Sequence, residues 1–398
     1  MTEESELKKL RIGSRAIRAS SHQDFGQVRS HVPPLFQTVN FDYESADHGL
    51  EVFRGDRPGY IYTRESNPTT DLFARAVAVL EEGESGLCAA SGMAAICAVF
   101  LAFTRPGDRV LSSGAIYGGT RSWLRDRLSA LDVTTRFVDI TDESAVTGAV
   151  ENNTRILFTE VLGNPNLVLA DIRRLSKIAR AHDLILVVDN TFTPPPINQP
   201  LKLGADLVVH SATKYLGGHG DIIGGVVVGP AGKLSEVHGV LHQYGAVLSP
   251  FNAWLGLRGL KTLGLRIERH CANAEKLANF LSNHARVVSV RYPGLKHHPQ
   301  HELARRRLNG CGGMLTFEVV GGLQGGIRLI NAVKLCQFTV SLGEIDTLIM
   351  HPASTSHAAL TAEERAAIGI TDGMIRMSVG CEDVDDLIDD LDSALAAV

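Results

Sequence analysis

The sequence lacks the features of export, of membrane insertion and of disulfide or zinc scaffolds. Its N-terminus, Met1-Thr2-Glu3-Glu4-Ser5, is polar and acidic and is not followed by the apolar segment of a signal peptide. No run of about 18 uncharged apolar residues occurs anywhere in the chain. The six cysteines are scattered without CxxC spacing. These absences predict a cytoplasmic protein with free thiols, no metal site and no membrane partner.

Basic clusters and nucleotide-binding glycine loops are absent as well. The formal net charge is -5 and the Lys and Arg residues are dispersed, so nucleic acid is not an expected partner. No GxGxxG follows the first expected strand, and Gly218-His219-Gly220 lacks the final Gly at that spacing. A Walker A motif is missing because Val227 occupies the place of its first Gly. The sequence therefore disfavours NAD-dependent and ATP-dependent chemistry.

What the chain does contain is a regular alternation of strands and helices. Its 398 residues, 44% of them hydrophobic, are enough for two or three domains. Between about 84 and 230, short apolar runs alternate with helical periodicity. The expected strands are Arg109–Ser112, Thr135–Ile140, Arg155–Glu160, Leu184–Asp189, Asp206–His210 and Gly225–Gly229, and the expected helices are Gly92–Phe103, Gly118–Leu131 and Ile172–His182. Near-continuous apolar strands of this kind indicate an α/β fold with a largely parallel sheet.

The two ends of the chain differ from this central region. Residues 1 to about 60 show weak periodicity and many turn-forming residues, which predicts an extended arm that packs on another domain or subunit. After about 250, helices dominate up to expected strands at Met314–Val320 and Met374–Val379, and a long helix is expected near 253–285. We therefore predict an arm over residues 1–62, a large domain over 63–255 and a small α+β domain over 256–398.

The most informative stretch follows the expected strand Asp206–His210. It reads Ser211-Ala212-Thr213-Lys214 and continues into a glycine-rich loop. Most lysines are solvated surface charges, but an amine held in a tight polar loop at a strand end can have a lowered pKa and a free lone pair. Ser211 and Thr213 lie two residues apart, so both hydroxyls can face one side and suit a phosphate. We predict that Lys214 is a catalytic amine.

Asp189 stands at the end of another buried strand. Ligands in open α/β sheets bind at the carboxyl ends of strands, although a capping role for Asp189 fits the sequence equally well. Together with Lys214, Asp189 matches the pair that a pyridinium cofactor needs. The carboxylate keeps the ring nitrogen protonated, and the ring then withdraws electrons from the substrate.

Other positions have both a functional and a structural interpretation. Gly92 and Met93 open an expected helix whose N-terminal N–H groups favour a phosphate, or they simply form a turn. Tyr117 opens the next helix and is free to stack on an aromatic ring, or it belongs to the core. Arg376 lies in an apolar strand, where its guanidinium suits a substrate carboxylate or a structural salt bridge.

Taken together, these motifs resemble the pyridoxal 5'-phosphate (PLP) enzymes of cysteine and methionine metabolism. This group contains cystathionine γ-synthase, cystathionine γ-lyase, methionine γ-lyase and O-acetylhomoserine sulfhydrylase. The match runs from about Phe36 to the C-terminus and keeps the family's order of motifs: Tyr62-Thr63-Arg64, Asn67-Pro68-Thr69, Ser91-Gly92-Met93, Tyr117-Gly118-Gly119-Thr120, Asn164-Pro165, Asp189-Asn190-Thr191, Ser211-Ala212-Thr213-Lys214, Ser341-Leu342-Gly343 and Arg376-Met377-Ser378-Val379-Gly380. The resemblance implies the PLP-dependent transferase fold of type I, which is similar to aspartate aminotransferase.

The resemblance also implies a role for each motif residue. PLP would be the cofactor, with Lys214 joined to it and later moving protons between substrate carbons. Asp189 would hold the pyridine nitrogen, and Tyr117 would stack on the ring and activate the incoming amine. The phosphate would lie on Gly92, Met93, Ser211 and Thr213, together with Tyr62 and Arg64 of a neighbouring subunit. Arg376 would bind the substrate carboxylate, supported by Ser341 and Asn164. The resemblance further implies a homotetramer, a dimer of dimers with shared active sites, acting on a small amino acid.

The choice of substrate depends on a few positions. Val340 stands where enzymes that handle cystathionine commonly place Glu, and an apolar Val cannot pair the distal ammonium. The segment from Ser341 through His351-Pro352-Ala353-Ser354 to His357 is similar to methionine γ-lyases and acylhomoserine sulfhydrylases. Gly119, however, replaces the Cys of many methionine γ-lyases, and Leu241-His242 replaces their Lys-Asp.

These features rank the possible reactions by how well the sequence fits each of them. We expect γ-elimination that gives 2-oxobutanoate, ammonia and a thiol, slightly ahead of γ-replacement. The replacement enzymes are O-acetylhomoserine or O-succinylhomoserine sulfhydrylases and cystathionine γ-synthases. A cystathionine γ-lyase, and after it a catalytically silent homologue, are less favoured.

Overall fold

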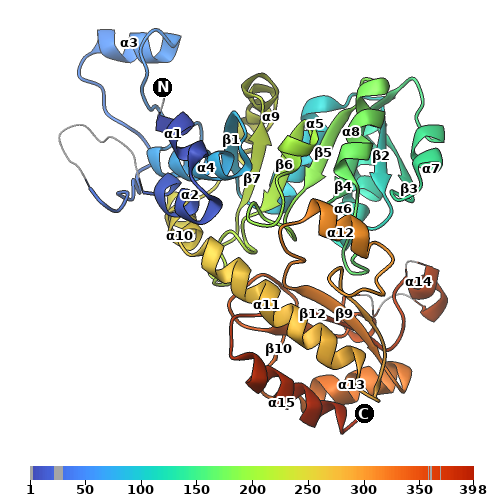
Figure 1. The fold of residues 1–398 in the computed structure, drawn as a ribbon. Coiled ribbons are helices and arrows are strands. Elements are labelled where there is room, and N and C mark those ends of the chain that lie inside the picture. Colours follow the sequence, from blue (N-terminus) through green and yellow to red (C-terminus); the bar gives the residue numbers. More distant parts are fainter. Residues whose placement is uncertain (1–2, 22–29, 357, 359–360, 368) are drawn as a thin grey trace.

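Two β-sheets organise the molecule. The computed structural model describes residues 3–21, 30–356, 358, 361–367 and 369–398, so parts of the expected arm and His357 lie outside the described residues. A seven-stranded sheet is built from residues 85–229 and a five-stranded sheet from residues 287–378. The helices α10 (Pro250–Leu260) and α11 (Leu263–Ser282) connect the two sheets (Figure 1). The expected α/β fold class is confirmed.

The large sheet is mostly parallel. Its strands are β1 (Ser85–Ala89), β2 (Arg109–Ser113), β3 (Thr134–Val138), β4 (Thr154–Glu160), β5 (Ile185–Asp189), β6 (Leu207–Ser211) and β7 (Gly225–Gly229). They lie in the order β1-β7-β6-β5-β4-β2-β3. Within the run β3-β2-β4-β5-β6, adjacent strands are parallel to each other. Strand β7 is antiparallel to both β6 and β1. The carboxyl ends of β4, β5 and β6 therefore meet at one edge of the sheet.

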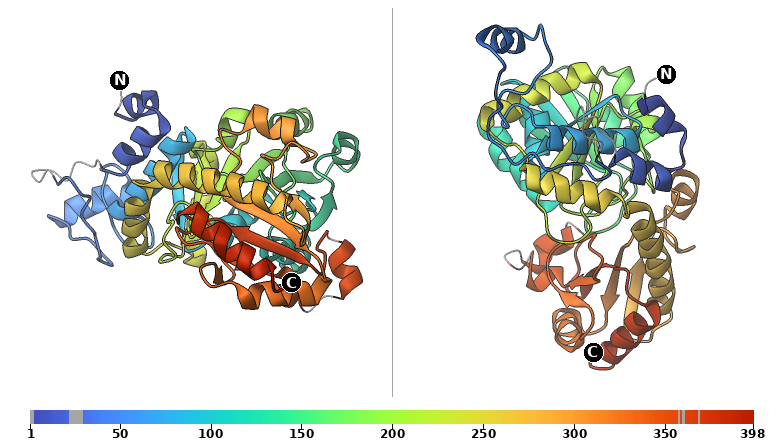
Figure 2. Two further views of the ribbon diagram at one scale, coloured as in Figure 1. Left: turned by 60° about the horizontal axis from the view of Figure 1, so that its bottom comes forward. Right: turned by 90° about the vertical axis from the view of Figure 1, so that its left-hand side faces the viewer.

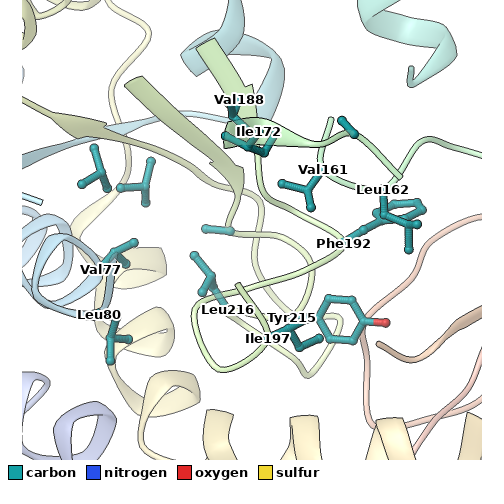
Figure 3. Packing of buried hydrophobic residues seen from close by; sticks show 14 of the residues in the cluster. Val77, Leu80, Val161, Leu162, Ile172, Val188, Phe192, Ile197, Tyr215 and Leu216 are labelled. Atoms are coloured by element: carbon teal, nitrogen blue, oxygen red, sulfur yellow. The ribbon is translucent and has the colours of Figure 1, made fainter. Parts of the chain in front are cut away.

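Helices cover both faces of this sheet. They are α4 (Pro68–Glu81), α5 (Gly92–Phe103), α6 (Gly118–Ser122), α7 (Glu143–Gly148), α8 (Ile172–Ala181) and α9 (Ala231–Tyr244). Because side chains alternate along a strand, Val188 of β5 packs with α4 and α8, and Val187 packs with α5 and α9. Figure 3 shows the first of these cores, in which Val77 and Leu80 of α4 share a cluster with Val188. Burial of each such side chain contributes ~1.5–3 kcal/mol.

The small sheet is mostly antiparallel. Its strands are β8 (Val287–Arg291), β9 (Met314–Val319), β10 (Gln337–Phe338), β11 (Leu348–Met350) and β12 (Met374–Ser378), in the order β10-β11-β12-β9-β8. Three helices, α11, α13 (Gly322–Ala332) and α15 (Val384–Leu395), share its apolar core, which contains Leu277, Leu329, Leu387 and Phe317. Two shorter helices, α12 (His301–Arg307) and α14 (Ala362–Ala367), complete this part of the chain.

The sequence predicted an extended arm, but the arm is not extended throughout. Helices α1 (Glu3–Lys9), α2 (Ile12–Ala19) and α3 (Ala46–Arg54) form within it. Helix α2 packs against α4 and α11, and buried Arg15 pairs with Glu82 at 2.7 Å. Short helices gain most of their stability from such tertiary packing, which a periodicity search cannot detect. Helix α3, in contrast, stands away from both sheets (Figures 1 and 2).

The expected long helix near 253–285 is two helices. The carbonyl of Gly259 accepts hydrogen bonds from Arg266 Nη2 at 2.9 Å and Thr262 Oγ1 at 3.2 Å. In an uninterrupted helix this carbonyl would accept from the N–H of residue 263. The side chains thus compete for it at the position where α10 ends and α11 begins.

A similar departure follows Tyr117. The expected helix Gly118–Leu131 begins as α6 but continues as a π-helical turn, Trp123–Leu128, and a 3-10 turn, Ser129–Leu131.

The cysteine thiols are free and have raised pKa values. The cysteines at 88, 97, 271, 311, 336 and 381 form no disulfide, and burial raises the pKa of each thiol, to about 12 for Cys97 and about 11 for Cys381. Within the described ranges, no helix combines the length and apolar character needed to cross a membrane. The same part of the chain contains no group of three or more His, Cys, Asp or Glu side chains suited to a metal ion.

Candidate active site

Two buried carboxyl groups lie side by side at the ends of β4 and β5. Glu160 and Asp189 are paired in register, and Asp189 is only 9% exposed. Asp189 Oδ1 accepts a hydrogen bond from the N–H of Thr191 at 2.9 Å. Burial raises the pKa of both groups, and the neighbouring Asp189 raises that of Glu160 further. A positive partner would offset the burial of Asp189, and a protonated pyridine nitrogen is such a partner.

Glu160 is a residue that the sequence predictions missed. Its carboxylate accepts hydrogen bonds from the N–H groups of Tyr117 at 2.6 Å and Asn164 at 3.2 Å. It therefore fixes the backbone of two predicted site residues at the same sheet edge. The sequence could have indicated this residue, because Glu160 ends a buried apolar strand in the same way as Asp189.

Lys214 lies just beyond β6 and faces the small sheet. Its Nζ donates a hydrogen bond to Ser341 Oγ at 2.9 Å. Burial lowers the pKa of Lys214, and the positive charge of Arg376 lowers it further. More of the amine is then neutral near pH 7, which is the form that attacks a carbonyl.

Arg376, the predicted carboxylate-binding residue, lies on β12. Its Nη2 donates to the carbonyl of Ser341 at 2.9 Å and its Nη1 to Asn164 Oδ1 at 3.3 Å. Its Nε is buried and has no hydrogen-bond partner among the described residues. Burial lowers the pKa of Arg376 to about 10. A carboxylate is the group that satisfies an unpaired guanidinium N–H of this kind.

Two of the expected phosphate-binding residues, Gly92 and Ser211, come together at the start of α5. A Cβ on Gly92 would lie 2.7 Å from Ser211 Cβ, so only glycine allows this approach. Ser91 caps the helix by accepting from the N–H of Ala94 at 3.0 Å. The N–H groups of Gly92 and Met93 precede the first intrahelical bond and are available to an anion. Thr213, which binds the N–H of Gly224 at 3.1 Å, lies two residues beyond Ser211.

Replacing Gly92 with alanine should therefore weaken cofactor binding. The added methyl group must push Ser211 and the start of α5 apart, and we expect about a tenfold loss of affinity for PLP, measured by titrating the apoenzyme. Gly232→Ala is the matched control, because a Cβ at that helical position meets nothing within 4 Å. Equal affinities for the two variants would remove Gly92 from the site.

Tyr117 is not a core residue. Its side chain is 49% exposed at the start of α6. The ring occupies the space above Gly119, where any Cβ would overlap it. The core alternative for Tyr117 is therefore wrong, and the ring is available to stack on a ligand.

Tyr62 and Arg64 form a separate group at the end of the expected arm and just beyond it. Arg64 Nη1 donates to the carbonyl of His242, at the end of α9, at 3.0 Å, and it lies 3.1 Å from Nε2 of the same histidine. The Arg64 guanidinium is 5.6 Å from the centroid of the Tyr62 ring. In this single chain Arg64 contacts Tyr62 and α9 rather than the group around Lys214. Val340, 60% exposed, adjoins that group through Ser341.

A cavity lies at a different place. It has a volume of about 540 Å³, and its walls include Ile12 and Ile17 of α2 and Leu265 and Glu268 of α11. These walls are mostly apolar and include none of the predicted site residues. The convergence of polar groups, rather than the size of this cavity, locates the candidate active site.

The chemistry of the sheet edge matches one class of cofactor. A half-buried lysine with a lowered pKa, a strand-end carboxyl and a helix N-terminus that only glycine can form are the groups that PLP requires. The fold and the site together define a PLP-dependent enzyme of fold type I.

Within that class, the chain belongs to the family of Cys/Met metabolism PLP-dependent enzymes, whose model matches residues 13–396. It is 46% identical to L-methionine gamma-lyase of Pseudomonas putida, over 96% of this chain and 97% of the relative. It is 41% identical to O-succinylhomoserine sulfhydrylase of Pseudomonas aeruginosa, over 99% of this chain and 98% of the relative.

A solved structure supports the same assignment. The O-acetylhomoserine (thiol)-lyase of Campylobacter jejuni, which carries N'-pyridoxyl-lysine-5'-monophosphate, superposes with a TM-score of 0.91. The two chains are 34% identical, and the match covers 96% of this chain and 99% of the other. The expected family and the expected cofactor, PLP, are confirmed.

Proposed function

We propose that the protein is a carbon–sulfur lyase that converts L-methionine and water into 2-oxobutanoate, ammonia and methanethiol. The observation that carries this proposal is the meeting of Lys214 Nζ, Ser341 and Arg376 between the two sheets. A basic amine therefore lies beside a group that binds a carboxylate. An α-amino acid substrate needs both, because its α-carboxylate is bonded to the carbon that loses a proton. Identity of 46% to an L-methionine gamma-lyase supports methionine as the substrate.

Specific residues are proposed to hold the cofactor. Lys214 binds it covalently, Asp189 pairs with its ring nitrogen, and Tyr117 stacks on the ring. The phosphate lies on Gly92, Met93, Ser211 and Thr213. When bound, PLP withdraws electrons from the substrate and so makes the protons on Cα and Cβ acidic.

The chain's own residues then bind the substrate and move its protons. Arg376, held by Asn164 and Ser341, binds the α-carboxylate and orients Cα. Tyr117 Oη accepts a proton from the substrate ammonium. Lys214 Nζ would take the proton from Cα, give it up to the cofactor and, as a free amine again, take one from Cβ. The bond between Cγ and sulfur then breaks, and the leaving thiolate takes up the proton that Tyr117 Oη had accepted. Ser341 Oγ keeps Nζ close to both carbons.

A substrate panel tests the reaction. The enzyme is incubated with methionine, homocysteine, cystathionine, O-acetylhomoserine and O-succinylhomoserine, each with and without an added thiol. Formation of 2-oxobutanoate from methionine alone supports the lyase. Product formation only from an acylhomoserine and a thiol would contradict it.

The second candidate is a γ-replacement transferase that acts on an acylhomoserine. Gly119 favours it, because many methionine γ-lyases carry Cys at this position, and a Cβ there would have to displace the exposed Tyr117 ring. Identity of 41% to an O-succinylhomoserine sulfhydrylase supports it as well. The same substrate panel separates the two candidates.

We also propose a homotetramer, built as a dimer of dimers, in which Tyr62 and Arg64 reach the cofactor phosphate of a neighbouring subunit. Large apolar side chains on the arm support this, since Val39 is 59% and Phe53 65% exposed. Exposed apolar groups on a projecting segment are typical of a subunit interface. The proposed division is an arm over 1–62, a PLP-binding domain over 63–255 and a small domain over 256–398.

Subunit complementation should detect the shared site. Lys214→Ala and Arg64→Ala are each expected to be nearly inactive, but a mixed dimer restores one site that has both residues. Random assortment on co-expression should then recover about a quarter of wild-type activity. The measurement is methionine turnover by the mixed protein, with each variant expressed alone as the control. No recovery would show that Arg64 and Lys214 act within one chain.

A further inference from the structure

A buried carboxylate–imidazole pair lies behind the cofactor site. Asp189 pairs in register with Val209, so the next residue, His210, points to the opposite face of the sheet. There His210 Nε2 is 2.6 Å from Oε1 of Glu81, the last residue of α4. The side chains of His210 and Glu81 are 1% and 0% exposed. Removing such groups from water is costly, so a pair at this depth is more than a surface contact.

Glu81 joins the two strand ends that carry the predicted cofactor ligands. Its Oε1 also accepts a hydrogen bond from Asn190 Nδ2 at 2.8 Å. Asn190 directly follows Asp189, and His210 directly precedes Ser211. The ladder between β5 and β6 has its last paired residues at Asp189 and Val209. Side-chain bonds through Glu81 therefore hold the strands together just where main-chain pairing stops.

The pair lies close enough to Asp189 to influence its charge. Burial raises the pKa of Asp189, hydrogen bonds from Thr191 lower it, and a proton on His210 would lower it further. Glu81 is the carboxyl group placed to balance such a proton. Among the described residues, Glu81 Oε2 and His210 Nδ1 have no hydrogen-bond partner, so the bond between Oε1 and Nε2 is what fixes the ring.

We propose that Glu81 and His210 are positioning residues for PLP. They set the relative placement of Asp189 and Ser211, and so hold the Asp189 carboxyl group in place for the pyridine nitrogen. The inference rests on the proposed roles of Asp189 and Ser211, but it is independent of the choice between lyase and transferase.

Three variants isolate these effects. Glu81→Gln keeps an oxygen acceptor toward Asn190 and His210 but removes the carboxyl group. His210→Gln keeps an amide donor toward Glu81 and removes the imidazole ring. Glu82→Gln is the matched control, because this adjacent carboxylate pairs with Arg15 and Lys202 and is 24% exposed. A fourth variant, Asp189→Asn, tests the role on which the inference rests.

Two measurements are made on each variant. The first is the affinity of the apoenzyme for PLP. The second is the NMR resonance of isotope-labelled pyridine nitrogen in the holoenzyme, which reports whether that nitrogen is protonated. Glu81→Gln and His210→Gln should each weaken PLP binding about tenfold and move the resonance toward neutral pyridine. The double variant should be no worse than either single one, and Glu82→Gln should match the wild type.

The outcomes are distinguishable. If both pair variants bind PLP like the wild type with an unchanged resonance, while Asp189→Asn shifts it, the pair is only structural and the inference fails. If Asp189→Asn also leaves the resonance unchanged, the proposed role of Asp189 fails with it. Should Glu81→Gln not fold, His210→Gln decides by the same two measurements.

Discussion

Replacing Lys214 with alanine is expected to lower the turnover of L-methionine by about 10⁴-fold or more, because both covalent binding and proton transfer are lost. The fold should survive, since the side chain contributes one hydrogen bond, to Ser341, and its burial already disfavours the charged amine. The measurement is single-turnover and steady-state production of 2-oxobutanoate, with circular dichroism to confirm folding.

A second lysine serves as the control for this change. Lys233 is half-buried on α9, and its Nζ lies 3.9 Å from Asp206 Oδ1. Asp206 precedes β6, so Lys233 lies at the opposite end of that strand from Lys214. Lys233→Ala should turn over methionine at the wild-type rate. A Lys214→Ala enzyme with full turnover would remove the basis of the proposed chemistry.

Arg376→Gln should show the second largest effect. The substrate carboxylate loses its charged partner, and the carbonyl of Ser341 and the side chain of Asn164 lose theirs. Hydrogen bonds to charged groups support an expected loss of about 10²-fold in kcat/KM. The sharper measurement compares methionine with the amine that lacks its carboxylate. The wild type should strongly prefer methionine, and the variant should lose most of that preference.

The control for Arg376 is another arginine of the same part of the chain. Arg365 pairs with Asp372 at 2.6 Å on the segment before β12. Arg365→Gln should cost stability but keep the preference for methionine over the amine. A preserved preference in Arg376→Gln would mean that a different group binds the carboxylate.

Much of the fold followed from periodicity. Six strands of the large sheet were expected within two residues of their ends, because buried parallel strands such as β5 are continuous apolar runs. The predicted and observed bounds of the helix Gly92–Phe103 are the same, and serine is a residue type preferred at the N-cap position that Ser91 occupies. The break between α10 and α11 could not be predicted, because it depends on the Arg266 side chain reaching the carbonyl of Gly259, seven residues earlier.

The candidate site was predicted in part. Lys214, Ser341, Arg376 and Asn164 are joined by hydrogen bonds although they are far apart in sequence. The motifs could name these residues, but their contacts depend on how the two sheets pack. Glu81 and His210 illustrate what was missed, since neither stands in a recognisable motif and each is meaningful only as a buried partner of the other.

The most direct test of the central claim is to trap the cofactor on its lysine. Purified holoenzyme is reduced with borohydride and digested, and the pyridoxyl-modified peptide is sequenced by mass spectrometry. The proposed chemistry predicts stoichiometric modification of Lys214. Modification of another lysine, or none at all in an active preparation, would contradict it.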